Sequence, residues 1–338
     1  MSVVAAAVVA PGAVRAPRVA FALGFVALAV GAAALAGALP IEFSLSTVFL
    51  FAGPHNWFEA RYALGRLPAR AGKLWGFFTV STVGIVGLTV TYAAVPVAIP
   101  HIADLSIAVG LYAVWSSVFL LWVAMLVWMR SRTNPRFDGG WVWPVACLIA
   151  AGVWLNPLAL PVALVYLHPL MALWLLDREL ARSRPQWRGA YRCVVACIPL
   201  LLGVLWWQLH DAPEPTGPTQ FAIAFAPTLA NHSASWFFDG VSPHFLVAAH
   251  AFLEMVHYGV WVVIIPLIGM RSRPWELKTI PAARKWSRGV AVVLLFGLLI
   301  VVTLWVCFGL DYATTRHVYF TVAMLHVLAE VPFLLRMV

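Results

Sequence analysis

The sequence has few charged residues. Only 10% of its 338 residues are aspartate, glutamate, lysine or arginine, against roughly 25% in soluble domains. Hydrophobic residues make up 63% of the chain. This balance excludes a water-soluble globular fold and predicts a polytopic membrane protein.

Cysteine is also scarce. The four cysteines, Cys147, Cys193, Cys197 and Cys307, all fall in apolar segments, whereas a disulfide framework requires an exposed, oxidising setting. Cys193 and Cys197 are four residues apart, so on a helix they would share one apolar stripe. The cysteines therefore indicate neither a disulfide scaffold nor a thiolate metal site.

Two metalloenzyme motifs are missing. The chain contains no His-x-x-His-His box of the kind that membrane desaturases use, and no His-Glu-x-x-His string of a zinc protease. Its first residues also lack the positive start of a signal peptide. We expect residues 1–17, which Pro11, Gly12 and Pro17 interrupt, to form a loosely ordered tail before a single membrane-embedded helical domain over 18–338.

Long apolar segments fill that domain. A transmembrane helix needs about 20 apolar residues. Ten segments qualify, near 18–38, 43–62, 74–97, 103–129, 141–157, 160–178, 191–209, 243–269, 289–310 and 316–335. We therefore predict an all-α bundle of about ten transmembrane helices. Its longest exoplasmic connection lies near 210–242, and it is either a plain loop or a lid at the membrane interface.

The basic residues alternate with these segments. All of the 22 lysines and arginines except Arg316 lie on one side of the predicted bundle. By the positive-inside rule both chain termini are cytoplasmic, and we expect a bacterial inner membrane. The net charge of +9 thus reflects topology. It predicts anionic lipid at the cytoplasmic loops and no nucleic-acid partner.

A His-x-x-x-Glu pattern occurs in three of the apolar segments. The pairs are His55 and Glu59, His250 and Glu254, and His326 and Glu330. Residues four apart lie on one face of a helix. Ionisable side chains inside a membrane are costly, and they mark functional sites.

Two further histidines extend this pattern, His168 in the sixth segment and His257 three residues after Glu254. The second, sixth, eighth and tenth segments all run from outside to inside under the predicted topology. At ~1.5 Å per residue, their polar groups fall within a band about 15 Å deep. We therefore predict one polar centre, shared by these four segments in the cytoplasmic half of the membrane.

Imidazole nitrogen and carboxylate oxygen together suit iron, zinc or manganese. The predicted metal ligands are His55, His168, His257 and His326. The groups predicted to bridge metals, orient ligands or handle protons are His250, Glu254, Glu59 and Glu330. The other histidines lie at or beyond the outer ends of segments, where we expect interfacial roles: His101, His210, His232, His244 and His317.

Helix geometry limits which residues of the eighth segment can bind the same ion. His250 and His257 would be about 10.5 Å apart along the axis, so they cannot both bind one ion in a regular helix. Glu254 and His257 have the Glu-x-x-His spacing of di-iron carboxylate bundles, although that architecture uses the spacing twice. One or two ions are therefore compatible with the pattern.

Gly53-Pro54-His55 in an early segment, with His250 and His257 in a late one, resembles the Brp/Blh family of β-carotene-cleaving membrane oxygenases. The resemblance implies a small multi-helix membrane protein in which intramembrane histidines hold a non-haem iron. After Pro-His this chain has Asn56-Trp57-Phe58-Glu59 in place of the family's small and acidic residues, and the spacing of its late histidines differs.

The sequence therefore predicts an integral-membrane metalloenzyme, an oxygenase that depends on non-haem iron and O2. Its substrate would be a hydrophobic molecule from the bilayer, such as a carotenoid, quinone or lipid. The pattern leaves three alternatives: a haem-binding membrane protein with axial histidines, a proton-coupled transporter, and an assembly factor whose buried polar groups only join helices.

Overall fold

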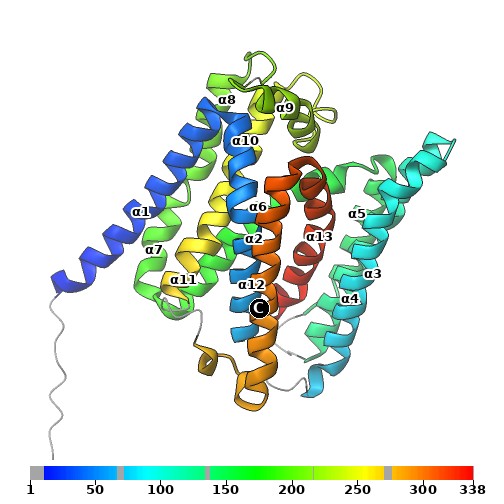
Figure 1. Ribbon diagram of the computed structural model, residues 1–338. Coiled ribbons are helices and arrows are strands. Elements are labelled where there is room, and N and C mark those ends of the chain that lie inside the picture. Colours follow the sequence, from blue (N-terminus) through cyan, green and yellow to red (C-terminus); the bar gives the residue numbers. More distant parts are fainter. Residues whose placement is uncertain (1–10, 67–71, 134–137, 216, 270–275, 338) are drawn as a thin grey trace, which may run out of the picture. The chain divides into compact units, whose positions relative to one another are not determined.

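The computed structural model describes residues 11–66, 72–133, 138–215, 217–269 and 276–337 (Figure 1). Every regular element in these ranges is helical and none is a strand, which confirms the predicted all-α class. The chain divides into a first unit, Met1–Val48 with Pro169–Ser272, and a second unit, Phe49–His168 with Arg273–Val338. Helices α2 (Pro40–Arg66) and α6 (Ala159–Ser183) contribute to both units.

Helices cover all ten predicted apolar segments. Besides α2 and α6, the longest helices are α1 (Pro11–Ala38), α3 (Trp75–Ala98), α4 (Leu105–Thr133), α12 (Ala283–Leu310) and α13 (Tyr312–Met337). The shorter ones are α5 (Val142–Leu155), α7 (Pro185–Val194), α8 (Cys197–Leu209), α9 (Gln220–His232), α10 (Pro243–Gly259) and α11 (Ile265–Ile268). Short 3-10 turns occupy Gly72–Leu74, Ile99–His101 and Leu277–Thr279.

Eight stretches of the described chain are long and apolar enough to cross a membrane, which indicates a multi-pass membrane protein. Two predicted segments are not among them. Helix α2 has sufficient length, but the polar run from His55 to Glu59 lowers its mean hydropathy. Helix α5 has 14 residues, about 21 Å at 1.5 Å per residue, which is shorter than a hydrocarbon core of about 30 Å.

The two predicted irregular regions are partly helical. Because α1 begins at Pro11, residues 11–17 of the expected tail are helical, and residues 1–10 lie outside the described residues. The predicted loop near 210–242 contains α9. The Thr219 side chain accepts a hydrogen bond of 3.1 Å from the Ala222 N–H, which satisfies one of the open donors at the start of a helix.

Helix α10 forms the core of the first unit. It packs against α1, α8 and α9, and all of its residues from Leu246 to Gly259 except Met255 are buried. Helix α1 is rich in buried alanines, and small residues let membrane helices approach closely. A Cβ at Gly259 would lie 2.5 Å from Leu28 Cδ2, so any larger residue there would force the Leu28 side chain of α1 to shift.

A π-helical turn follows α10 over Val260–Ile264. The Ile265 N–H donates to the Val260 carbonyl, five residues earlier. Pro266 has no N–H, so it cannot make the usual helical bond to Val262, and such gaps permit an extra residue in the turn. The turn places a local distortion just beyond the segment that carries His250, Glu254 and His257.

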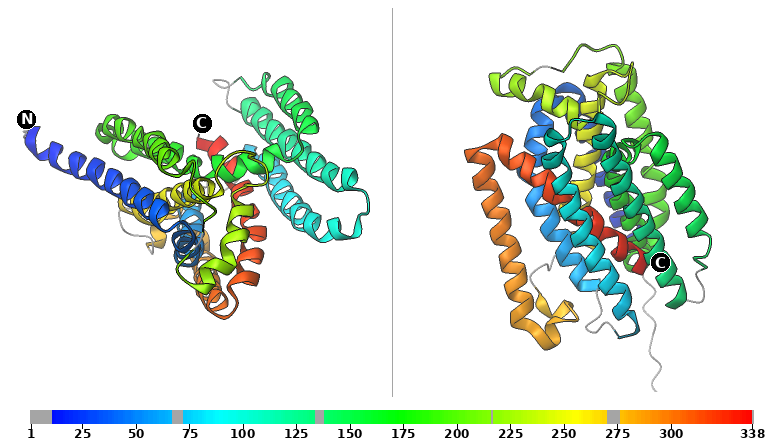
Figure 2. Two further views of the ribbon diagram at one scale, coloured as in Figure 1. Left: turned by 90° about the horizontal axis from the view of Figure 1, so that it is seen from above. Right: turned by 90° about the vertical axis from the view of Figure 1, so that its right-hand side faces the viewer.

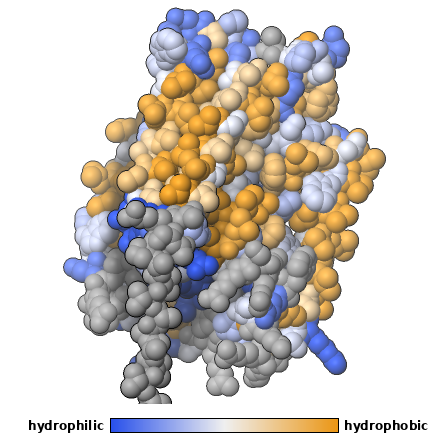
Figure 3. Space-filling view, turned by 90° about the vertical axis from the view of Figure 1, so that its left-hand side faces the viewer, coloured by the Kyte–Doolittle hydropathy of each residue, from blue (hydrophilic) through white to orange (hydrophobic). Residues whose placement is uncertain are grey.

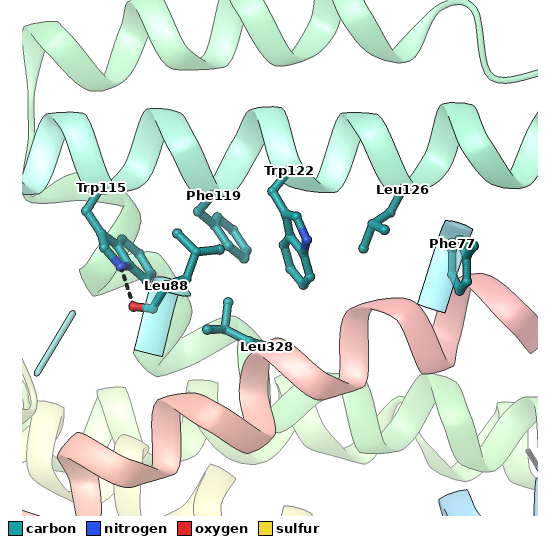
Figure 4. Packing of buried hydrophobic residues seen from close by; sticks show 7 residues of the cluster. All are labelled: Phe77, Leu88, Trp115, Phe119, Trp122, Leu126 and Leu328. Carbon is teal, nitrogen blue, oxygen red and sulfur yellow. Dashed lines mark hydrogen bonds between the residues drawn. The ribbon is translucent and has the colours of Figure 1, made fainter. Parts of the chain in front are cut away.

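Aromatic residues of α3 and α4, with Leu328 of α13, form a core of the second unit (Figure 4). The Trp115 and Phe119 rings stack at 5.6 Å between centroids. Trp115 Nε1 donates to the Leu88 carbonyl and Trp122 Nε1 to the Val80 carbonyl, so both buried indoles have acceptors. Helix α4 also packs against α5 (Figure 2).

The surface carries many large apolar side chains. Val19 and Leu23 of α1, and Val292, Leu295 and Phe296 of α12, are each more than half exposed. Hydrophobic residues cover much of the face drawn in Figure 3, and hydrophilic ones gather along its upper edge. Exposed apolar surface of this extent is typical of a membrane interface.

Gly84 of α3 is expected to be essential for the packing of Trp122. A Cβ at this position would overlap the buried indole of Trp122, and overpacking costs about 1–3 kcal/mol. Gly84→Ala should therefore lower the thermal unfolding temperature of the chain in detergent. Gly87→Ala is the matched control, because a Cβ there meets open space. Equal stability of the two variants would contradict this packing.

Candidate metal centre

Ionisable side chains of the second unit come together from three helices. We call this group cluster A; its members are His55 and Glu59 on α2, His168 on α6, and His326 and Glu330 on α13. The i, i+4 spacing on α2 and α13 places each histidine and glutamate on one helix face. His55, Glu59 and Glu330 are buried, and the other two are half-buried.

His55, Glu59 and His326 lie close enough to hold one ion. One potential ligand atom from each residue lies within 4.8 Å of the other two. The His55 and His326 rings meet edge to face, with 5.2 Å between centroids. Two imidazoles and one carboxylate are the donor set of non-haem Fe(II) oxygenases and of some catalytic zinc sites, in which further coordination positions stay open.

The hydrogen bond of His55 determines which of its nitrogens can bind a metal. Its Nδ1 lies 3.1 Å from the Phe51 carbonyl oxygen. Because a carbonyl only accepts, Nδ1 carries the proton and the neutral ring has its lone pair on Nε2. This arrangement directs Nε2 away from the backbone of α2, as is typical of a metal-binding histidine.

Glu59 supplies an independent reason for a cation at cluster A. Its carboxylate is buried, and its Oε2 has no hydrogen-bond partner among the described residues. A buried carboxylate oxygen without a donor is costly. A bound cation would remove that cost.

Glu330 orients His168 toward His326. Glu330 Oε2 lies 3.2 Å from His168 Nδ1, and His168 Nε2 lies 3.2 Å from His326 Nε2. Two imidazole nitrogens on one ion, each at about 2.0–2.1 Å, would be about 2.8–3.4 Å apart for bond angles of about 90–109°. The observed separation suits shared ligation, and it also suits an N–H···N hydrogen bond between the two rings.

A second His/Glu group lies in the first unit. We call it cluster B; its members are His232 at the end of α9, and His250 and Glu254 on α10. Their potential ligand atoms also lie within 4.8 Å of one another. The His232 and His250 rings are 4.9 Å apart between centroids, and His250 Nδ1 is 3.6 Å from Glu254 Oε2. Cluster B thus repeats the donor types of the triad in cluster A.

The predicted site residues are therefore found in two groups. His55, His168 and His326 lie together with Glu59 and Glu330 in cluster A. His250 and Glu254 belong to cluster B.

His257, a predicted ligand, lies outside both His/Glu triads found among the described residues. It is buried in the first unit, where its Nδ1 donates to the Pro169 carbonyl at 3.3 Å. The missed residue is His232, for which we expected an interfacial role. The apolar character of 221–238 was the only signal for a helix there.

Neither the protein-family models, nor the curated proteins, nor the solved structures that were compared with the chain gave a match. The fold and the two clusters define a multi-pass helical membrane protein with buried His/Glu groups that could hold a metal. Inference about function therefore starts from the geometry of clusters A and B.

Removing the Glu330 carboxylate should weaken metal binding without removing a ligand. Loss of a carboxylate that orients a histidine typically costs about 10–100-fold in metal affinity. We expect this loss in Glu330→Ala and a smaller one in Glu330→Gln, which keeps an acceptor for His168 Nδ1. Competition titration with an iron chelator measures both. Glu214→Ala, at an exposed loop position, is the control, and equal affinities in Glu330→Ala and this control would argue against the orienting role.

Proposed function

We propose that this protein is an integral-membrane metalloenzyme that binds a non-haem iron at cluster A and oxidises a hydrophobic substrate with O2. The observation that carries this proposal is the triad of buried His55, buried Glu59 and half-buried His326, whose ligand atoms lie within 4.8 Å of one another. Two imidazoles and one carboxylate leave coordination positions for O2 and substrate. When bound, the iron would supply the activation of O2.

Each side chain of cluster A has a proposed role. His55 Nε2, Glu59 and His326 hold the ion, and His168 contacts the triad from outside through its Nε2, 3.2 Å from His326 Nε2. Glu330 keeps the His168 ring in the required tautomer. His55, Glu59 and Glu330 are buried, and exclusion of bulk water would limit side reactions at a bound ion.

The substrate class follows from the surroundings of the site. Pro54 and Pro169 lie inside α2 and α6, next to His55 and His168. Proline removes a helical hydrogen bond and kinks the helix, which would make room for a molecule entering laterally from the bilayer. A carotenoid, quinone or lipid fits this route. The resemblance to the Brp/Blh family favours cleavage of a carbon–carbon double bond, in which one O2 yields two carbonyl groups without an external reductant.

We also propose the finer topology. Helix α2 has 27 residues, about 40 Å at 1.5 Å per residue, and its buried polar face accounts for its low hydropathy. With α2 and α5 added to the eight candidate spans, the chain crosses the membrane ten times and both termini are cytoplasmic. The basic loops then face anionic lipid, and the localisation is a bacterial inner membrane.

One observation favours a second function, proton-coupled transport. His326, His168 and Glu330 form a chain of contacts of 3.2 Å each, and such chains relay protons in transporters. In that case the buried Glu59 would be protonated and the purified chain would contain no metal.

Metal content distinguishes these functions. We expect purified wild-type chain to contain iron, and His326→Ala and Glu59→Gln to lose about one equivalent of metal each, together with O2 uptake in the presence of a bilayer substrate. Glu59→Gln nearly conserves volume, so it tests the site even where a histidine substitution impairs folding. His317→Ala alters an exposed histidine on the same helix as His326 and should retain both properties. Metal-free protein that remains active would refute the proposal.

A further inference from the structure

We infer that cluster B is a separate metal site that binds a zinc-like divalent cation and fastens α9 to α10. This role is distinct from the proposed oxidation at cluster A. It concerns the long connection between α8 and α10, which the sequence leaves as either a plain loop or a lid.

The ligands of cluster B come from two elements. His250 and Glu254 are one helical turn apart on α10, and both are buried. His232 is the last residue of α9 and lies half-buried against them, its ring 4.9 Å from the His250 ring. An ion bound by all three would join 232 to 250, and so close the end of the connection onto the core helix of the first unit.

The distance between the ligand atoms of His250 and Glu254 is close to that of two ligands on one ion. His250 Nδ1 and Glu254 Oε2 are 3.6 Å apart, longer than the usual 2.7–3.2 Å of an N–H···O hydrogen bond. A nitrogen at about 2.0–2.1 Å and an oxygen at about 2.0–2.2 Å from one ion would be about 2.8–3.5 Å apart for bond angles of about 90–110°, so a shift of about 0.1 Å would bring this pair into range. Two histidines and a glutamate are a known zinc donor set, with water completing the coordination.

The turn that ends α9 just after His232 contains a residue in an unfavourable backbone conformation. The Ser235 N–H donates to the Ala230 carbonyl and the Ala234 N–H to the Asn231 carbonyl, the two bonds of a Schellman motif. That motif usually has glycine at its left-handed position, but here Ala234 occupies it with φ of 58°. Left-handed backbone is unfavourable for alanine, so an ion held by His232 would help to keep α9 in this conformation.

The test uses the full chain in detergent, stripped with a chelator and reloaded with Zn²⁺ alone. Hydrogen–deuterium exchange is followed in peptides over 220–238. If Zn²⁺ binds only the docked form, a concentration 100 times its dissociation constant slows exchange through undocking of α9 by about 100-fold. We expect this protection in the wild type, in His326→Ala and in His210→Ala, whose histidine is 41% exposed in the same connection.

Substitutions in cluster B should abolish the protection. We expect His232→Ala and the nearly isosteric Glu254→Gln to show no zinc-dependent slowing and to bind one equivalent less than the wild type. A wild-type chain whose α9 exchange ignores Zn²⁺, or a His232→Ala variant that responds as the wild type does, would overturn the inference. His326→Ala alters only cluster A. The zinc response of α9 therefore tests cluster B whether or not cluster A binds iron.

Discussion

The cost of placing an ionisable group away from water is the constraint on which both clusters depend. An isolated carboxylate or imidazolium is expensive to bury, yet His55, Glu59, His250, Glu254 and Glu330 are all buried. They are found beside one another in groups of mixed imidazole and carboxylate, not scattered along the helices. Mutual contact offsets part of the cost, and a divalent cation would offset more, because it neutralises the carboxylate and uses the imidazole lone pairs.

The rest of the fold keeps these groups in position. In the first unit, α10 packs against α1, α8 and α9, and Gly259 of α10 lies against the Leu28 side chain of α1. In the second unit, the indoles of Trp115 and Trp122 join α3 to α4 by hydrogen bonds to backbone carbonyls. Helix α13, which carries His326 and Glu330, packs against α3, α4 and α12. Rigid helices thus present the ligands, as a preorganised metal site requires.

Helical periodicity made much of this predictable. All ten apolar segments are helical, and the i, i+4 pairs at 55/59 and 326/330 lie in one cluster, joined there by His168. The sequence could not reveal the role of His232, because only the tertiary packing of α9 on α10 brings this histidine to His250 and Glu254. It could not place the left-handed Ala234, since alanine carries no signal for that conformation. The assignment of His257 as a ligand and the resemblance to the Brp/Blh family remain predictions.

In the proposed function, imidazole and carboxylate ligands of cluster A hold a non-haem iron. The most direct measurement is the iron X-ray absorption spectrum of the chain purified from membranes, recorded with its optical spectrum. We expect a coordination shell of nitrogen and oxygen at about 2.0–2.2 Å with imidazole scattering, which weakens in His326→Ala. A Soret band, sulfur ligation, or protein that contains no iron would contradict it.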